Sequence, residues 1–430
     1  MAERNWGGNV TYHARDLHRP RTLEDVQAVV RQATAPRPLG TRHSFNTLPD
    51  TPGELISLEH LNRVLALDPQ RRTVTIQGGV RYGELGRYLH DHGFALPNLA
   101  SLPHISVAGA CMTGTHGSGD RQPSLAAAVR AMELVTASGD IVRTSREQEG
   151  DRFAGMVVSL GALGMVTELT LNIEPTYQVR QDVYEGLRLA EVERHFDEVM
   201  SAADSVSLFT TWQDEVFHSA WLKRRSTPDT PVPPVWFGAG RATQEHHPIP
   251  GLDAASCTPQ LGVAGPWFER LPHFRLSHTP SNGEEVQSEY LLPREHATAA
   301  LRTLFTLGER LSGLLLVSEV RTVRADDLWL SPAYRRDSVA VHFTWRRDEA
   351  AVRRVLHEVE DALAPFEARP HWGKVFVTPP ERLQTVYPRL PDFRSLCNDL
   401  DPHGRFQNAF LQAVIGVPAA DSSAVSSLRR

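Results

Sequence analysis

Cysteine, long apolar runs and an excess of basic charge are all scarce or missing in this sequence of 430 residues. The three cysteines, Cys111, Cys257 and Cys397, are dispersed and form no CxxC pair. This spacing favours reduced, buried thiols over a disulfide framework or a zinc site. No run of about 18 apolar residues is present, so we expect neither a membrane-spanning helix nor a membrane partner. The first residues carry Glu3 and no apolar signal segment, which predicts a cytoplasmic protein.

Acidic residues outnumber basic ones, because 51 Asp and Glu stand against 45 Lys and Arg, a formal charge of −6. This balance supplies no basic surface for a nucleic acid, so we do not expect one as a partner. The patterns GxGxxG and GxxxxGK[ST] are also missing, which argues against a classical dinucleotide fold and against a P-loop. A chain of this length exceeds what one hydrophobic core usually organises, which favours two domains.

Short β-prone runs and amphipathic helical segments alternate in the first part of the chain. Residues 22–33 predict a helix, because Thr22 and Asp25 form a capping pattern ahead of valines at helical spacing. A second helix is expected just before Gly93. Strands are predicted at residues 54–58, 63–68, 73–77 and 164–174, and a hairpin at residues 132–145. The first three of these strands suggest one small sheet.

Longer strands and helices follow Pro175, including helices expected near residues 189–203 and 348–363. Residues 226–283 are rich in proline, glycine and histidine, which predicts long surface loops. The small polar stretch 419–430 is expected to fray into solvent. We therefore predict a first domain over residues 1–175, a second over residues 176–397, and a return to the first domain with a flexible tail over residues 398–430.

Two glycine-containing stretches in the predicted first domain have the composition of ligand-binding loops. They read PLGTRHSFN at residues 38–46 and SLPHISVAGACMTGTHGSG at residues 101–119. A pyrophosphate needs several converging backbone N–H donors, and glycine-rich turns supply them without side chains in the way. Both stretches therefore predict contact with a phosphate-bearing ligand.

The two stretches resemble the FAD-binding segments of the vanillyl-alcohol-oxidase type flavoprotein superfamily. Later motifs are similar to those of the alditol oxidases, which are relatives of the sugar aldonolactone oxidases: SEVRTV at residues 318–323, VHFTW at 341–345, HWGK at 371–374 and DPHGRFQN at 401–408. The likeness covers most of the chain and is weakest between residues 205 and 283. It implies an α+β fold with an FAD-binding domain and a substrate domain, the latter built on an antiparallel sheet flanked by helices.

The resemblance also implies a cofactor site, in which a ring nitrogen of His43 is bonded to the 8α-methyl group of FAD. Asn408 is expected near the flavin edge or ribityl chain, with a turn-forming asparagine as the alternative. The implied FAD-binding residues are His43, Leu39, Gly40, Thr41, Arg42, Ser44, Phe45, Asn46, Ser106, Gly109, Ala110, Gly114, Thr115, His116, Gly117, Ser118, Val166 and Asn408.

Polar residues alternate along three apolar strand segments. Period-two spacing places Glu319 with Arg321, His342 with Thr344, and Gln287 with Glu289 on one face of their strands. Such a face often meets solvent, and this alternative stays open from the spacing alone. The resemblance instead implies a substrate pocket formed by Ser106, Gln287, Glu319, Arg321, His342, Thr344 and Lys374.

In that pocket Glu319 would accept hydrogen bonds from polyol hydroxyls, and Arg321 and Lys374 would stabilise charge on the oxygen as its proton leaves. Lys374 with a lowered pKa, His342 or water could take the proton. No metal is expected, because His116 and the run Glu245-His246-His247 lack further ligands at suitable spacing.

The resulting expectation is a monomeric enzyme that oxidises a terminal alcohol of an alditol such as xylitol or sorbitol. Hydride would pass to flavin N5, and dioxygen would reoxidise the flavin to give hydrogen peroxide. An aldonolactone oxidase or dehydrogenase of the same superfamily is the first alternative. A flavin-free binding module that kept the fold is the second.

Overall fold

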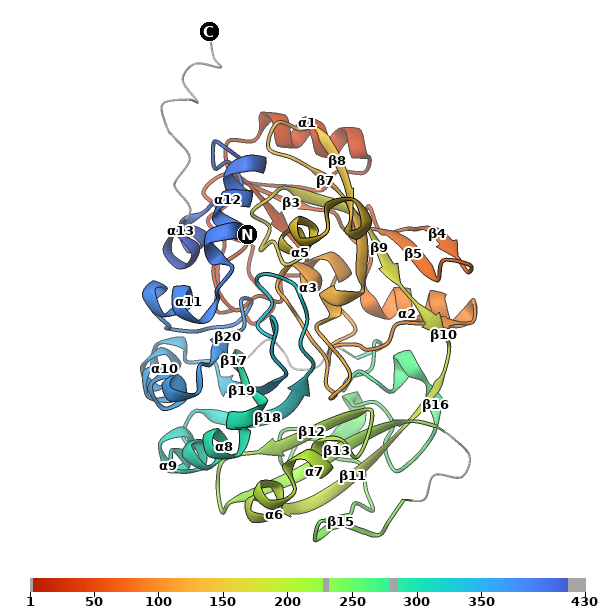
Figure 1. Cartoon of the computed structure of the whole chain (residues 1–430), viewed down its shortest axis with the longest axis vertical. Helices are drawn as coiled ribbons and strands as arrows, with labels where there is room; N and C mark the ends of the chain where they lie inside the picture. Colours follow the sequence, from red (N-terminus) through yellow and green to blue (C-terminus); the bar gives the residue numbers. More distant parts are fainter. Residues whose placement is uncertain (1–2, 227–231, 279–284, 417–430) are drawn as a thin grey trace.

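A computed structural model describes residues 3–226, 232–278 and 285–416 (Figure 1). The first part of the chain forms two sheets. A parallel sheet runs in the order β1 (Asp16–His18), β3 (Glu54–Ser57) and β2 (Pro36–Leu39). An antiparallel sheet runs in the order β4 (Val64–Asp68), β5 (Thr73–Gln77), β9 (Met165–Asn172), β7 (Val129–Val135) and β8 (Ile141–Ser145). A short pair, β6 (Phe94–Ala95) with β10 (Glu174–Pro175), completes the strands of this part of the described chain.

Each local prediction in this region has a counterpart, but the expected single small sheet is wrong. The first predicted helix is α1 (Leu23–Gln32), with the capping box between Thr22 and Asp25 in place. β3 pairs in parallel with β1 and β2, whereas β4 and β5 join the antiparallel sheet through β9. Alternating hydrophobicity marks a strand but does not name its partner, which tertiary packing decides.

Four further helices belong to the same region. They are α2 (Tyr82–Asp91), α3 (Val107–Met112), α4 (Arg146–Glu149) and α5 (Asp151–Val157). Gly93 ends the α2 region in a left-handed conformation with φ of 82°, as expected of a glycine after a helix. α3 lies inside the second glycine-containing stretch and carries it over the hydrophobic core.

A single large sheet, ten-stranded in the described residues, dominates the rest of the molecule. Its order is β14 (Val235–Trp236), β15 (Ala239–Arg241), β11 (Gln178–Arg188), β13 (Val216–Arg225), β12 (Ser205–Thr210), β18 (Leu315–Val323), β19 (Ser338–Arg346), β17 (Glu285–Pro293) and β20 (Arg369–Pro370), with β16 (Gly265–Pro266) paired to β11. Every pairing within this sheet is antiparallel.

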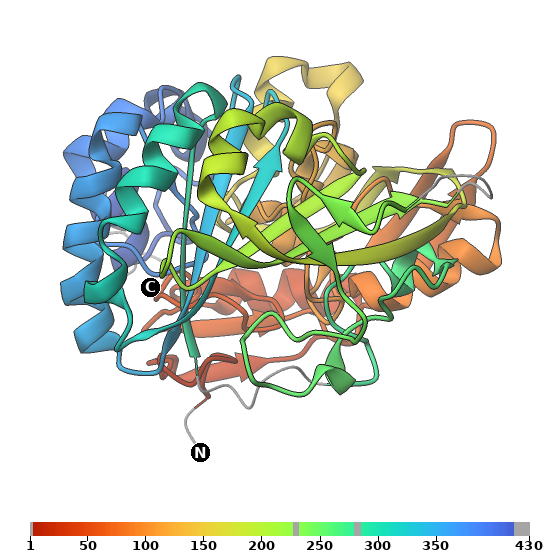
Figure 2. The ribbon, with the colours of Figure 1, turned by 90° about the horizontal axis from the view of Figure 1, so that it is seen from below.

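Helices cover one face of this sheet (Figures 1 and 2). They are α6 (Leu189–Arg194), α7 (Phe196–Met200), α8 (Ala297–Phe305), α9 (Gly308–Leu311) and α10 (Glu349–Leu363). Their apolar sides share one buried cluster with Val320, Phe343 and Trp345 of the central strands. The helix predicted at residues 189–203 is broken in two, because His195, with φ of −129°, lies outside the helical region.

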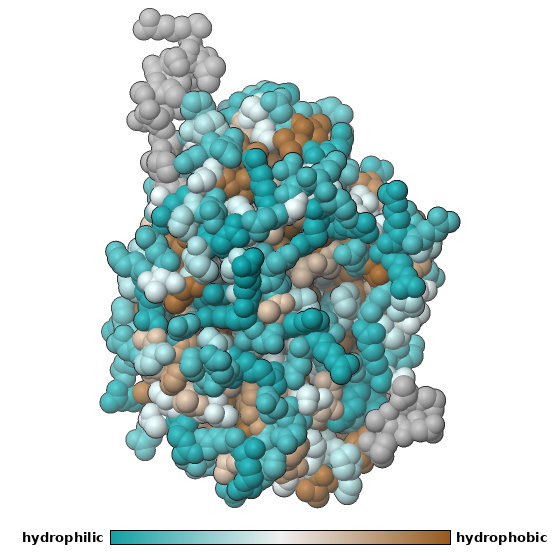
Figure 3. Space-filling model, viewed as in Figure 1, coloured by the Kyte–Doolittle hydropathy of each residue, from teal (hydrophilic) through white to brown (hydrophobic). Residues whose placement is uncertain are grey.

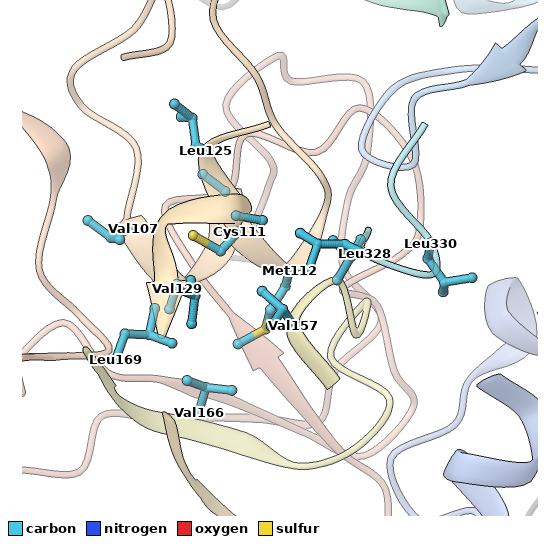
Figure 4. Close-up of a cluster of buried hydrophobic side chains, with 14 of the residues drawn as sticks. Val107, Cys111, Met112, Leu125, Val129, Val157, Val166, Leu169, Leu328 and Leu330 are labelled. Carbon is cyan, nitrogen blue, oxygen red and sulfur yellow. The ribbon is translucent and has the colours of Figure 1, made fainter. Parts of the chain in front are cut away.

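The core beneath α3 joins distant parts of the chain (Figure 4). Met112 of α3 and Val157 of α5 pack in the same buried cluster as Leu328 and Leu330, which follow β18. Burying these side chains together removes apolar surface from water, which stabilises the contact between the two halves. The second glycine-containing stretch is therefore supported by residues from both halves.

The C-terminal helices pack against the first half of the chain. They are α11 (Pro380–Val386), α12 (Leu390–Leu400) and α13 (Ala409–Ile415), and their apolar residues belong to the cluster that contains α2 and α3. The return thus begins near Pro380 in the packing, earlier than the expected limit at residue 398. The predicted tail at residues 419–430 lies outside the described residues.

Hydrophilic and hydrophobic side chains are interspersed on the molecular face that Figure 3 displays. Among the described residues, no helix is both long and apolar enough to cross a bilayer. The reduced cysteines expected from the sequence are present as free, buried thiols at Cys111, Cys257 and Cys397.

Two helix caps allow a test of burial. Asn408 caps α13 by accepting from Leu411 N–H, and its amide donates to the carbonyls of Thr47, Leu48 and Asp50. Thr22 caps the exposed start of α1. We expect Thr22→Ala to lower the free energy of unfolding by about 1 kcal/mol and Asn408→Ala by about 2 kcal/mol or more, because buried carbonyls lose their donor. Urea unfolding measures both losses, and equal losses would contradict this account.

Candidate active site

A cavity of about 550 Å³ lies where the two glycine-containing stretches meet the second face of the large sheet. The first stretch follows β2, the second contains α3, and the sheet contributes side chains from β17, β18 and β19. The loop after β20, which carries HWGK, closes another side of the cavity with His371, Gly373 and Lys374. Segments far apart in the sequence therefore line one cavity.

The first stretch presents unpaired backbone donors to this cavity. The backbone N–H groups of residues 41–44 donate no hydrogen bond to any described part of the chain. Arg42 has a left-handed conformation with φ of 65°, and left-handed residues are typical of loops whose successive N–H groups bind an anion. This arrangement suits an anionic ligand such as a pyrophosphate.

His43 belongs to this loop and is half-buried, with its ring stacked on Trp6 at a centroid distance of 5.3 Å and an angle of 23°. Its Nδ1 atom lies 3.1 Å from Thr41 Oγ1. Burial, followed by the neighbouring His104 ring, lowers the pKa of His43 to about 4. The imidazole is therefore neutral at neutral pH and keeps a nitrogen lone pair.

Close packing joins the second stretch to the first. Ser106 N–H donates to Thr41 Oγ1 at 3.2 Å. A Cβ atom on Gly40 or on Gly109 would lie only 2.9 or 2.7 Å from Ser106 Oγ. A Cβ atom at either position would therefore force the Ser106 hydroxyl to move. His116 Nδ1–H donates to the Gly117 carbonyl, while Nε2 faces Glu289 at 3.4 Å without forming a hydrogen bond.

Most residues expected to bind FAD line the cavity. They are Leu39, Gly40, Thr41, Arg42, His43, Ser44, Phe45, Ser106, Gly109, Ala110, Thr115, His116 and Val166. Five others are not among its lining residues: Asn46, Gly114, Gly117, Ser118 and Asn408.

Other features of the structure explain why these five residue types stand at their positions. Asn46 donates to the carbonyls of Trp372 and Lys374, which ties the first stretch to the HWGK loop. Ser118 donates to the Val206 carbonyl of β12. A Cβ on Gly117 would lie 2.4 Å from Asn98, and Gly114 has φ of 67°. Asn408 caps α13, so the turn-forming alternative describes it better than flavin contact.

All seven residues expected to form the substrate pocket line the same cavity: Ser106, Gln287, Glu319, Arg321, His342, Thr344 and Lys374. In the strand register, Glu319 and Glu289 flank His342 directly on either side, and Gln287 pairs with Thr344. Glu319, Arg321, His342 and Thr344 are only 5–8% exposed. The polar face is therefore buried, and the solvent-exposed alternative is wrong.

Glu289 is the anion at the centre of this face. Its carboxylate is 2% exposed, lies 2.9 Å from Lys374 Nζ and accepts a hydrogen bond from the Arg321 guanidinium. Burial alone would raise the pKa of Glu289, but Lys374 and Arg321 hold that pKa well below its usual range. The side chain therefore carries a full negative charge that both cations share.

His342 is locked into one neutral tautomer. Lys374 Nζ donates to its Nδ1 at 2.6 Å, so the ring proton resides on Nε2 and donates to Thr344 Oγ1 at 3.1 Å. Burial and then Lys374 hold the pKa of His342 well below its usual range. Burial also lowers the pKa of Lys374, against the attraction of Glu289.

Three further residues belong to this site. Glu289 shares the strand alternation of Gln287, so the sequence pattern contained its signal. His371 is the first residue of HWGK; burial lowers its pKa to about 3, and its Nδ1 accepts from Gly373 N–H. His273 donates from Nε2 to Glu319 at 2.8 Å. It lies in the loop-rich segment 226–283, where no periodic pattern marks it.

That loop-rich segment also forms a wall of the cavity. Its residues His247, Pro248, Ile249, Leu252 and Phe274 are among those that line the cavity. Ile249 and Phe274 pack on a small cluster with residues of β11, β12 and β13, which holds the segment against the sheet. The region described from sequence as surface loops is thus partly a site-forming element.

The residues fit FAD better than a metal. The free N–H groups of residues 41–44 suit the pyrophosphate. Among the described residues, no group of three or more His, Cys, Asp or Glu is placed to hold a metal ion. The site can therefore bind an anionic cofactor and surround a second, hydroxyl-bearing molecule with charged groups.

Comparisons with known proteins agree with this site. A family model of an FAD-binding domain matches residues 17–145, and a model of D-arabinono-1,4-lactone oxidase matches residues 279–414. An alditol oxidase of Streptomyces sp. is 50% identical to this chain, over 96% of this chain and 98% of that protein. An L-gulono-1,4-lactone dehydrogenase of Mycobacterium tuberculosis is 29% identical, with the same shares covered.

Solved structures share the fold. A cholesterol oxidase from B. sterolicum gives a TM-score of 0.76 at 14% identity, over 97% of this chain and 96% of that one. A glucooligosaccharide oxidase from Acremonium strictum, described with a 6-S-cysteinyl, 8α-N1-histidyl FAD, gives 0.71 at 15% identity over 94% and 93%. These likenesses confirm the predicted α+β FAD-binding fold. With the 50% identity to an alditol oxidase over nearly the whole chain, they establish that the chain belongs to the alditol oxidase family of FAD-dependent oxidoreductases.

Proposed function

We propose that the protein oxidises a terminal alcohol of an alditol, with FAD as the hydride acceptor and dioxygen as the final oxidant. The main support is a buried row formed by Glu319, His342 and Glu289 on adjacent strands. The cations of Arg321 and Lys374 lie beside this row. An open-chain polyol presents several hydroxyls at once, and this row offers both carboxylate acceptors and cationic donors. Bound FAD would supply the two-electron chemistry that no side chain provides.

Lys374 and Arg321 would stabilise the substrate oxygen as it loses its proton. The ammonium form of Lys374 is favoured because it donates to both Glu289 and His342. His342 has no free lone pair, since Nδ1 accepts from Lys374 and Nε2–H donates to Thr344. Of the three proton acceptors compatible with the sequence, water remains the best candidate.

The lactone alternative has specific support in the matching model of D-arabinono-1,4-lactone oxidase over residues 279–414. The alditol assignment rests on the higher identity to an alditol oxidase, 50% against 29% for the lactone dehydrogenase. The Glu319 and Arg321 pair, with Thr344 in the same cavity, also suits a chain of hydroxyls. We therefore assign the open-chain polyol as substrate.

We further propose that FAD is bonded covalently to His43. Support comes from the neutral imidazole, its stacking on Trp6 and its position beside the free backbone donors. The new bond would join a ring nitrogen of His43 to the 8α carbon as the nitrogen and the methyl group each lose a proton. Dioxygen would accept the two electrons and two protons to give hydrogen peroxide.

Substrate class is tested by peroxide release from the purified protein. We expect xylitol and sorbitol to give peroxide and L-gulonolactone to give little, because the carboxylates and cations match several free hydroxyls. The protein should also be yellow. Peroxide or dye reduction with gulonolactone alone would assign the lactone chemistry, and colourless protein without polyol turnover would favour a flavin-free binding module.

Lys374 provides a test of charge stabilisation. We expect Lys374→Met to lower kcat about a hundredfold or more while FAD binding persists. In the wild type, kcat/KM should fall as pH rises through the lowered pKa of Lys374, because the ammonium is lost below the usual pH for lysine. A pH profile of polyol oxidation measures this decline.

Controls for Lys374 separate charge from packing. Lys374→Arg retains a cation and should shift the alkaline decline upward, whereas Lys374→Met should remove it. Arg321→Ala should also lose about a hundredfold or more in turnover. Activity that rises with pH in the wild type would make Lys374 the base, and near-normal turnover in both Lys374→Met and Arg321→Ala would remove this site from consideration.

The covalent bond is tested with His43→Ala. We expect wild-type protein to keep its flavin fluorescence after acid precipitation and His43→Ala to release the flavin into the supernatant. His13→Ala is a matched control, because the His13 side chain is 81% exposed and contacts Asp50. A wild-type pellet without flavin would show that the cofactor is held by noncovalent contacts alone.

A further inference from the structure

Behind Glu319 lies a lysine that the proposed reaction does not use. Lys223 of β13 is 1% exposed, and its Nζ donates to the carbonyls of Leu271 and Pro272 and to His273 Nδ1. An ammonium group has three donors, and all three are used here. Among the described residues, no carboxylate lies within ion-pair distance of Lys223. Burial lowers the pKa of Lys223 to about 7, and an apolar side chain of similar size would avoid the cost of burying the charged form.

The contact with Lys223 determines how His273 is protonated. Because Nδ1 accepts from Lys223, the ring proton must reside on Nε2, which donates to Glu319 Oε1 at 2.8 Å. Burial, followed by the nearby charge of Lys223, lowers the pKa of His273 to about 4, so the ring is neutral at neutral pH. Lys223, Glu319 and Arg321 are the charged groups that face this ring.

The His273 ring is also held in place from its other sides. It packs edge-on against Trp221 and Phe209 at centroid distances of 5.1 and 5.7 Å. Its backbone N–H donates to the carbonyl of Ser101 at 3.0 Å. Ser101 is the first residue of the second glycine-containing stretch. The ring is therefore fixed relative to both the large sheet and the second glycine-containing stretch.

Glu319 needs such a support. Its other oxygen lies 3.5 Å from Arg321 Nε, a contact too long for a strong hydrogen bond. The Arg321 guanidinium instead donates to Glu289. The short contact that orients the Glu319 carboxylate is thus the one from His273.

We propose that Lys223 and His273 are positioning residues that hold Glu319 as a hydrogen-bond acceptor for one hydroxyl of the polyol. Lys223 keeps the His273 proton on Nε2, and His273 fixes the Glu319 carboxylate toward the cavity. The effect of these residues on catalysis rests on the proposed alditol oxidation. The chain of hydrogen bonds from Lys223 through His273 to Glu319 does not depend on that proposed function.

Paired variants separate positioning from packing. His273→Leu removes the donor to Glu319, and we expect kcat/KM for xylitol to fall about tenfold or more. His273→Gln places an amide N–H near the original Nε2 position and should recover most of this loss. Lys223→Met should lower kcat/KM about threefold to tenfold in the wild-type background and have little further effect when combined with His273→Gln.

The substrate provides a second control. A vicinal diol with the chain length of xylitol lacks the remaining hydroxyls, so its oxidation should be less sensitive to His273→Leu than xylitol oxidation. Flavin absorbance should stay near wild type in Lys223→Met, which would show that the cofactor site is intact. Equal losses with both substrates would mean that His273 only supports the fold.

The ring nitrogen signals of His273 test the hydrogen-bonded order without any substrate. In holoenzyme labelled with ¹⁵N-histidine, the signals lost in His273→Gln identify this residue. We expect wild-type His273 to be neutral with its proton on Nε2, and in Lys223→Met to become protonated at a higher pH, because the nearby positive charge is gone. A proton on Nδ1, or an unchanged titration in Lys223→Met, overturns the proposal.

The outcomes also separate the two proposals. If wild-type protein fails to oxidise polyols, the proposed substrate is wrong, and the ring nitrogen signals alone decide whether Lys223 and His273 orient Glu319. If polyols are oxidised but His273→Leu retains full kcat/KM for xylitol, the positioning role is wrong while the proposed function stands.

Discussion

The buried carboxylate of Glu289 is the constraint on which the arrangement of the site depends. It attracts the guanidinium of Arg321 from β18 and the ammonium of Lys374 from the HWGK loop. A buried anion without such partners would be strongly destabilising, so each of the three groups fixes where the other two can lie. Lys374 in turn determines the tautomer of His342. The charge of Glu289 thereby influences the protonation of both Lys374 and His342.

The same constraint couples the two halves of the molecule. The HWGK loop carries Lys374 to Glu289, and Asn46 of the first glycine-containing stretch donates to the carbonyls of Trp372 and Lys374. His273 makes a comparable connection, through Ser101 to the second stretch and through Glu319 to the sheet. The cavity is therefore bounded by polar contacts from both halves, which limits how far one half can move without breaking a buried hydrogen bond.

Residues that lie close in sequence were the most predictable part of the site. The alternation of Glu319 with Arg321 and of His342 with Thr344 placed each pair on one strand face, as the register confirms. Helices with a cap and an apolar stripe, such as α1 and α10, were also predictable within a few residues. By contrast, Asn408 has the spacing of a motif residue but serves as a helix cap. His273 lies in a segment without periodicity, so no local pattern marks it.

Residue spacing along single segments is enough to predict the local elements, the two glycine-containing stretches and the polar faces of the central strands. The pairing of the strands, the burial of the polar face and the inclusion of Glu289 and His273 in the site emerge only in the folded molecule. These features depend on contacts between segments far apart in the chain, and neither spacing nor composition encodes which segments meet. The charge state of Lys374 and the tautomer of His342 follow from those contacts, so neither could be predicted from the sequence.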